Sequence, residues 1–253
     1  MQAVSVSFFR FAGTGNRLWA FAQMQFARAG LRAMDGIGFF KLFGTGTGEG
    51  FTPVPNPGVY AILATWPSLD VARRSVADGA VYGRWRDHAV EHATLYLSAV
   101  ASRGSWDNQA PFALEPSEGL PRPIAVLTRA TVKLRHVLAF WRQTPDISAT
   151  VRAQDRLLFK IGMGEVPWLQ QVTFSVWDDP AAMVAFAQRS ASHHGAVQQV
   201  RRNGWFREEL YARFRVLAQE GTWEGRDLLA GRQTRPAGGT DRPVAEAGQP
   251  AAV

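Results

Sequence analysis

The sequence contains no cysteine. This absence excludes disulfides, thiolate-ligated haem, iron–sulfur clusters held by cysteine and cysteine-based zinc sites, and it is compatible with a reducing compartment. No run approaches eighteen consecutive apolar residues, so we expect no membrane-spanning helix. The first residues, MQAVSVSFFRFAG, lack the basic segment of a signal peptide and favour a strand.

Acidic residues are fewer than basic ones, which gives a net charge of +7 and a pI of about 10.5. This balance suits an acidic partner, such as an anionic membrane surface or an acidic electron donor. No block rich in Lys and Arg and no nucleic-acid-binding motif occurs, so we expect no nucleic-acid partner. The nine tryptophans indicate apolar burial, a flat ligand or contact with a membrane interface.

Hydrophobic patterning predicts a similar order of elements in each half of the chain. In the first half we expect strands at 4–11, 37–43, 59–66 and 94–100, and helices at 17–32, 69–76 and 82–92. In the second half we expect strands at 124–132, 157–162 and 171–177, and helices at 136–142, 147–153 and 180–189.

Short sequence matches support a duplication. Ala20-Phe21 matches Ala139-Phe140 and Phe40-Lys41 matches Phe159-Lys160, both with a shift of 119 positions. Further matches follow in the same order: Trp66 with Trp177, Leu95-Tyr96 with Leu210-Tyr211, and 104–106 with 221–223. The chain is therefore predicted to be α+β, with tandem ferredoxin-like units forming a dimeric α/β-barrel-type fold within one chain. The alternative is two ferredoxin-like domains that do not share a barrel.

Composition sets the predicted boundaries. The first repeat covers residues 1–106, and a linker rich in proline covers 107–123. The second repeat covers 124–223, and residues 224–253, rich in Gly, Pro and Ala, are expected to be disordered.

The stretch from Ser190 to Val216 combines two histidines, several arginines and aromatics. If residues 192–202 form a helix, His193 lies on one face with Ala196, Val197 and Val200. An inward histidine followed by arginines suits an anionic, iron-bearing macrocycle, because imidazole can bind iron and guanidinium groups pair with carboxylates. A core histidine hydrogen-bonded to a carbonyl, with solvated arginines, also explains these residues. When only these residues are considered, this structural explanation is favoured.

Other patterns have structural explanations that compete with functional ones. His88 and His92 at i, i+4 could share a metal, but the pattern is HxxxH and no third ligand follows. His136 at a helix start can act as a cap. The loop GTGTGEG lacks the remaining residues of a phosphate-binding motif, and no GxSxG sequence supports a nucleophilic serine.

Long segments resemble the spheroidene monooxygenase family, the acyclic carotenoid 2-ketolases of purple photosynthetic bacteria. These segments are FRFAGTGNRLWAFAQMQFAR, GFFKLFGTGTGEGF, YAILATWPSL, LTRATVKLRHVLAFW, LFKIGMGEVPWLQQVTFSVW and NGWFREELYARF. The resemblance covers nearly everything from Val4 to about Trp223, and the tail carries no part of it.

The resemblance implies an iron-containing haem b enzyme that uses O2 and an external reductant, with reduced ferredoxin as the expected donor. It would oxidise C-2 of spheroidene or a related acyclic carotenoid twice, and the geminal diol would lose water to give the 2-ketone. The competing classes are a haem enzyme of another reaction type, a dehydratase or peroxidase, and a non-enzymatic α/β-barrel binding protein. We expect a cytoplasmic protein peripheral to the photosynthetic inner membrane, and the sequence does not fix its oligomeric state.

The resemblance also suggests site residues. The family's helix pattern best matches His193, Ala196 and Arg201, with His194 and His88 as rival iron ligands. Arg201 and Arg202 would hold the propionates, and Trp177, Phe174 and Trp205 would line an apolar slot for the polyene. Arg129 and Lys160 are suggested as distal donors from their strand positions alone.

Overall fold

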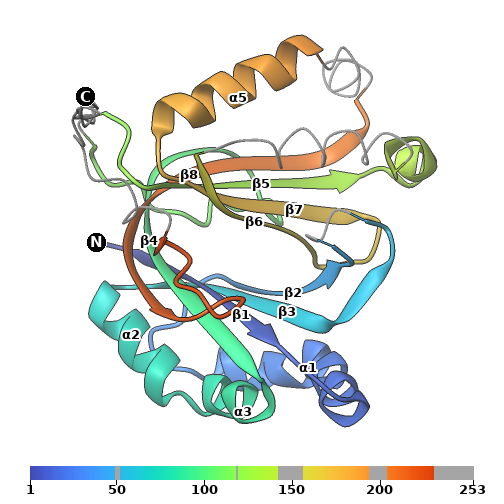
Figure 1. Ribbon diagram of the computed structural model, residues 1–253, viewed down its shortest axis with the longest axis vertical. Coiled ribbons are helices and arrows are strands. Elements are labelled where there is room, and N and C mark those ends of the chain that lie inside the picture. Colours follow the sequence, from blue (N-terminus) through green and yellow to red (C-terminus); the bar gives the residue numbers. More distant parts are fainter. Residues whose placement is uncertain (49–51, 118, 142–155, 194–203, 231–253) are drawn as a thin grey trace, which may run out of the picture.

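The computed structural model describes residues 1–48, 52–117, 119–141, 156–193 and 204–230, and only the backbone of 187–193. Eight strands close into one antiparallel barrel in the order β1-β3-β2-β6-β7-β5-β8-β4 (Figure 1). The barrel confirms the predicted fold class and excludes two domains without a common barrel.

The first half contributes four strands and three helices. The strands are β1 (Ala3–Arg10), β2 (Phe40–Gly46), β3 (Pro55–Trp66) and β4 (Glu91–Gly104). The helices are α1 (Thr14–Arg32), α2 (Leu69–Asp78) and α3 (Ala80–His88). Ser68 begins α2, because its hydroxyl oxygen accepts a hydrogen bond from the backbone N–H of Val71.

The second half repeats the strand order. Its strands are β5 (Ile124–Val132), β6 (Leu157–Gly164), β7 (Gln170–Trp177) and β8 (Phe206–Gly221). The 3-10 turn η1 (Leu134–His136) precedes helical residues 137–141, and α5 (Pro180–His193) follows β7. Helix α5 lies on the opposite side of the barrel from α1, α2 and α3 (Figure 1).

The two halves meet at two unequal seams. Strands β4 and β8 pair along their length, from Ala93 opposite Gly221 to Gly104 opposite Leu210. The pairing between β2 and β6 consists of Gly44–Gly164 and Thr45–Met163. The second seam is therefore short.

The barrel interior holds a core shared by both halves. Phe8 of β1 has its ring centroid 5.1 Å from that of Phe159, 5.8 Å from that of Phe174 and 5.9 Å from that of Trp223. Phe112 lies between the two repeats in sequence and packs edge-on against Phe214 at 5.0 Å. Residues 107–123, predicted as a linker, thus contribute a buried side chain to the core.

Most predicted elements within the described residues are observed. The helix predicted at 147–153 lies outside them, and β8 (Phe206–Gly221) was not among the predicted strands. Three further segments differ from the prediction. The helix expected at 82–92 ends at His88, and His92 belongs to β4, so the two histidines do not share a helix face. The predicted helix at 180–189 extends to His193. Residues 224–230, expected to be disordered, include the buried Leu228.

One of the sequence matches, Phe40-Lys41 with Phe159-Lys160, pairs residues whose side chains lie on opposite faces of the barrel wall. Lys41 and Lys160 lie on corresponding strands, but Lys41 faces the barrel interior and Lys160 is paired with Ser175 on the outer face. An irregularity in β6 between Leu157 and Phe159 shifts the pairing by one residue, which reverses the face of the following side chains.

None of the helices in the described part of the chain combines the length and apolarity needed to cross a membrane.

Candidate functional site

The outer face of the second half-sheet carries small side chains at its centre. Strand register places Gly162, Thr173, Thr128 and Tyr211 in one row across β6, β7, β5 and β8. The next row toward the β6–β7 turn contains Gly164, Gln171, Ala130 and Glu209. The interior side chains of these strands, such as Phe174 and Leu127, point the other way into the core.

The first half-sheet has large side chains on the corresponding strands. Its outer face presents Phe9, Tyr60 and Ile62, which pack with residues of α1 and α3. The centroid of Trp85 lies 5.1 Å from that of Phe9 and 6.2 Å from that of Trp19. The first half therefore fills the space between sheet and helices with aromatic rings, whereas the second half has mainly small residues there.

Helix α5 crosses the outer face of the second sheet (Figure 1). Its first turns are anchored, because Met183, Val184 and Phe186 pack on Ile124 and Trp177. The ring of Phe186 lies 5.3 Å from that of Trp177, whose indole N–H donates to Ser175 at 3.0 Å. This anchor lies beyond one end of the rows of small residues, so the helix continues past the anchor toward His193.

Two cations end one of the outer rows. Lys160 on β6 and Arg213 on β8 are in register with Ser175 and Val126, which lie between them. Lys160 is 8% exposed, so its charge lies within the protein. The face thus combines small residues at its centre with positive charge along one border, which suits a flat ligand that carries carboxylates.

Several predicted site residues lie outside the part that the structure describes. His194, Arg201 and Arg202 are not described, and His193 is described only as the last backbone position of α5. In the described residues no group of three His, Asp or Glu side chains could hold a metal ion.

The remaining candidate histidines and aromatics have stacking partners. His88 stacks on Trp19 at 3.9 Å, and its Nδ1 lies 3.0 Å from Oδ1 of Asn16, in the first half of the chain. Trp205 stacks on His136 with their ring centroids 5.1 Å apart. Phe174 faces the barrel core, so it does not share a face with Trp177.

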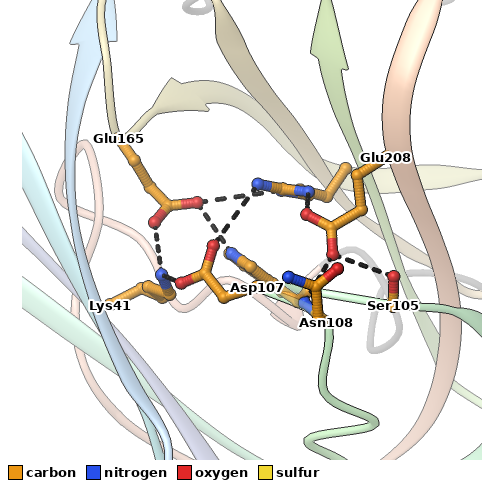
Figure 2. A network of polar contacts seen from close by, with 8 residues as sticks. Lys41, Ser105, Asp107, Asn108, Glu165 and Glu208 are labelled. Carbon is orange, nitrogen blue, oxygen red and sulfur yellow. Dashed lines mark hydrogen bonds and ion pairs between the residues drawn. The ribbon is translucent and has the colours of Figure 1, made fainter.

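Arg129 lies inside the barrel, not on the face that α5 covers. Its side chain is 1% exposed and forms ion pairs with Glu208 of β8, Asp107 and Glu165, the three carboxylates labelled in Figure 2. Its guanidinium carbon lies 5.6 Å from the ring centroid of Trp106. Arg129 therefore does not lie where a distal donor to a ligand under α5 would have to be.

The ionic cluster around Arg129 joins both halves at one end of the barrel. Lys41 pairs with Asp107 and, at 2.7 Å, with Glu165, whose other oxygen accepts from the indole N–H of Trp106 at 2.7 Å. The five ionic members of the cluster, two cations and three carboxylates, are Lys41, Arg129, Asp107, Glu165 and Glu208.

Glu208 is held ionised within this cluster. Burial acts to raise its pKa, but hydrogen bonds from the Asn108 N–H and the Ser105 hydroxyl, each 2.8 Å long, act in the opposite direction. Together with the Arg129 guanidinium they lower the pKa to about 2.

The sequence analysis did not identify Glu165 or Trp168, which lie in and beside the β6–β7 turn. Glu165 is a cluster carboxylate, and Trp168 adopts a left-handed backbone conformation with φ of 66°. The only signal in the sequence was their place within the segment GMGEVPWLQ, between two predicted strands.

Comparison with known proteins identifies close relatives. The chain is 46% identical over 229 residues to spheroidene monooxygenase of Cereibacter sphaeroides, covering 90% of this chain and 70% of that protein. It is 45% identical over 236 residues to spheroidene monooxygenase of Rhodobacter capsulatus, covering 92% of this chain and 97% of that protein. The spheroidene monooxygenase of Rubrivivax gelatinosus is 30% identical over 210 residues, covering 83% of this chain and 80% of that protein. No family model matches the chain.

Solved structures support the fold at low sequence identity. The aldoxime dehydratase OxdRE in complex with butyraldoxime superposes with a TM-score of 0.57 at 11% identity, covering 90% of this chain and 85% of that one. A second aldoxime dehydratase has a TM-score of 0.52 at 12% identity, covering 85% of this chain and 81% of that one. At these identities the likeness concerns the barrel fold alone.

The pKa of Glu208 predicts sensitivity to acid. Because this pKa is lowered from 4.5 to about 2 on folding, the unfolded chain binds the proton first. The stabilisation is complete above pH 4.5 and decreases as the pH falls toward about 2. Glu208→Gln should lower the free energy of unfolding at pH 7 by about 1–3 kcal/mol and flatten its pH dependence in that window.

Urea denaturation across this pH range measures the effect, with the exposed Asp35→Asn as the control. Parallel profiles for the wild type and Glu208→Gln would contradict the assignment.

Proposed function

The chain belongs to the spheroidene monooxygenase family, and from that premise we propose that it is a haem-dependent carotenoid monooxygenase. It would introduce a 2-keto group into spheroidene and related acyclic carotenoids by two successive O2-dependent oxidations at C-2. Two hydroxylations of one carbon give a geminal diol, and loss of water leaves the ketone. An external donor, for which reduced ferredoxin is our proposal, would supply electrons.

The observation that carries the proposal is the contrast between the two outer faces of the barrel. A porphyrin is flat and needs a surface without large side chains between a sheet and its covering helix. Gly162, Thr173 and Thr128 offer such a surface on β6, β7 and β5, with Tyr211 of β8 at the end of their row, whereas Phe9 and Tyr60 fill the corresponding space in the first half. The described residues on the outer face of the second half-sheet therefore fit a haem group.

The residues that would hold haem come from the end of α5 and the strand border. His193 is the proposed iron ligand, with His194 and His88 as rivals, and Arg201 and Arg202 would pair with the propionates. Arg213 and Lys160 add positive charge on the sheet side. When bound, haem would activate O2, which no side chain of this chain can do alone.

The protein's own residues would orient the substrate and limit the access of water. The packing of Met183 and Phe186 on Trp177 would close one end of a space for the ligand between α5 and the sheet. Small hydroxyl-bearing residues such as Thr128 and Thr173 place weak hydrogen-bond donors on the floor of this space. Lys160 and Arg213 would favour carboxylates at the border and leave the centre for an apolar group.

Product analysis tests the reaction. The purified protein, supplied with haem, an acyclic carotene, O2 and a reductant, should form the 2-ketone. With labelled O2, the ketone oxygen should carry the label after correction for exchange, because both diol oxygens derive from O2. Label that arrives only from water would contradict an oxygenation and would favour another reaction type.

Haem retention tests the ligand independently of activity. His193→Ala should abolish the Soret band of the purified, haem-supplemented protein, because the iron loses its protein ligand. His194→Ala should retain the band, and so should His88→Ala, because His88 is stacked on Trp19 in the other half. Loss with His194→Ala and retention with His193→Ala would reassign the ligand. A wild-type protein without a Soret band would favour a non-enzymatic binding protein.

We also propose peripheral contact with the photosynthetic inner membrane from the cytoplasmic side, through α1. Helix α1 exposes Leu18, Phe21 and Phe26, whose exposed fractions are 64%, 69% and 73%. Arg17 and Arg32 are exposed on the same helix, and the chain carries a net charge of +7. Exposed apolar side chains beside basic ones are typical of a helix that lies at an anionic membrane surface.

Vesicle flotation tests this contact. Leu18→Ser/Phe26→Ser should lower the fraction bound to anionic vesicles at least about tenfold, because burying each side chain contributes about 1.5–3 kcal/mol. The matched control is Val90→Ser/Leu114→Ser, which removes two apolar side chains that are 61% and 54% exposed outside α1. Equal binding of both double variants would exclude α1 as the contact.

A further inference from the structure

An apolar groove of about 490 Å³ lies beside the short seam between β2 and β6. Its walls come from α1, the β2–β3 connection, the β6–β7 turn and the helical residues after η1. Its apolar lining consists mainly of Phe21, Met24, Tyr60, Trp141, Met163 and Trp168, together with prolines of both connections. This volume is within the range of about 300–1,000 Å³ that is usual for small-molecule sites.

Polar side chains in the groove are largely committed to protein partners. The Thr45 hydroxyl donates to the Val59 carbonyl at 3.1 Å, and Oδ1 of Asn56 accepts from the Gly58 N–H at 2.9 Å. Glu165 is paired with Lys41 and Trp106. A ligand therefore meets mainly hydrocarbon and aromatic surface, and the carboxylate of Glu165 at one end disfavours an anionic head group.

Trp168 connects the two sides of the groove. Its indole N–H donates to the Pro53 carbonyl at 2.8 Å, and its own carbonyl accepts from the indole N–H of Trp141 at 3.1 Å. A bulky residue in the left-handed region costs about 1–2 kcal/mol, so the backbone is strained at this position. This conformation places the half-exposed indole of Trp168 at the groove, where it connects the β6–β7 turn to the β2–β3 connection.

The groove borders the outer face of the second sheet. Gly164 and Gln171 line the groove and also belong to the row next to that of Gly162 and Thr173. Two residues along a strand span about 6.4–6.8 Å, so an occupant of the groove ends beside the small-residue surface. At the other side the groove reaches Phe21 on the exposed face of α1.

We propose that this groove binds the neutral hydrocarbon end of an acyclic polyene and directs it from α1 to the face under α5. The inference rests on the proposed function and specifies where its substrate binds. The occupant is an elongated, uncharged hydrocarbon, because the groove is apolar and the one charged residue among its described walls is a carboxylate. Trp168 is a binding residue at the mouth of the groove.

Gly44 provides the test, since a Cβ at this position would meet Tyr60 Cε1 at 3.9 Å and its φ is not in the left-handed region. Gly44→Leu should therefore fill the groove without a backbone clash. The control is Gly83→Leu on α3, where a Cβ would lie 4.0 Å from the flexible Arg86. Trp168→Ala is a second variant, and because this side chain is 53% exposed its removal should permit folding.

Lycopene is the probe, titrated in detergent micelles and followed by the visible circular dichroism that an achiral carotene acquires when bound. Gly44→Leu and Trp168→Ala should each raise the dissociation constant at least tenfold, while Gly83→Leu changes it less than twofold. Retinoic acid, which carries a carboxylate, should bind at least tenfold more weakly than lycopene. Wild-type affinity for lycopene in Gly44→Leu and Trp168→Ala, or tighter binding of the acid, overturns the proposal.

Activity separates this proposal from the proposed function. If the wild type forms the ketone and Gly44→Leu does so with an unchanged KM, the groove assignment fails and the function stands. If lycopene binds as expected but no ketone forms with any reductant, the function fails and the groove stands.

Discussion

The buried guanidinium of Arg129 constrains the end of the barrel where the two repeats meet. A charge that is 1% exposed requires compensation, because an unpaired ion in this environment costs several kcal/mol. Carboxylates from β8, from the segment after β4 and from the β6–β7 turn supply it, and Lys41 of β2 connects two of them. The cluster therefore fixes the β6–β7 turn relative to the first half, and this turn carries Trp168 and one wall of the apolar groove.

Duplication has given the barrel two outer faces that have diverged in side-chain size. The same strand order builds both, yet one face is filled by Phe9, Tyr60 and Trp85 and the other carries Gly162, Thr128 and Thr173. The filled face stabilises the fold by burying aromatic surface, and the face with small residues gives up that burial. The second half buries less apolar area on its outer face. The aromatic packing of the first half and the shared interior core compensate for this loss.

Periodicity in the sequence was sufficient for most of the helices and strands, because alternating and helical patterns are local properties. The duplication and the barrel were inferred from repeated matches such as Phe40-Lys41 with Phe159-Lys160. Pattern reasoning was not sufficient for every residue. It failed where the outcome depended on a single residue. The irregularity beside Phe159 reversed the face of Lys160, and nothing in the segment LLFKIGMG marks that shift. The end of α3 at His88 was missed because the helical pattern was extended to His92, although β4 begins at Glu91. The inward direction of Arg129 depends on carboxylates distant in sequence, so a strand position alone could not predict it.

The short pairing of β2 with β6 links these features. Glycines form one of its two residue pairs, and Gly44 and Gly164 lack the side chains that would fill the space beside the seam. A longer seam would close the barrel more tightly, but it would also remove the groove that leads from α1 to the second sheet. The extensive pairing of β4 with β8 and the ionic cluster hold the two halves together, so the β2–β6 seam contributes little to their association. In this arrangement, the strongest contacts between the repeats lie away from the surface on which an apolar ligand would enter.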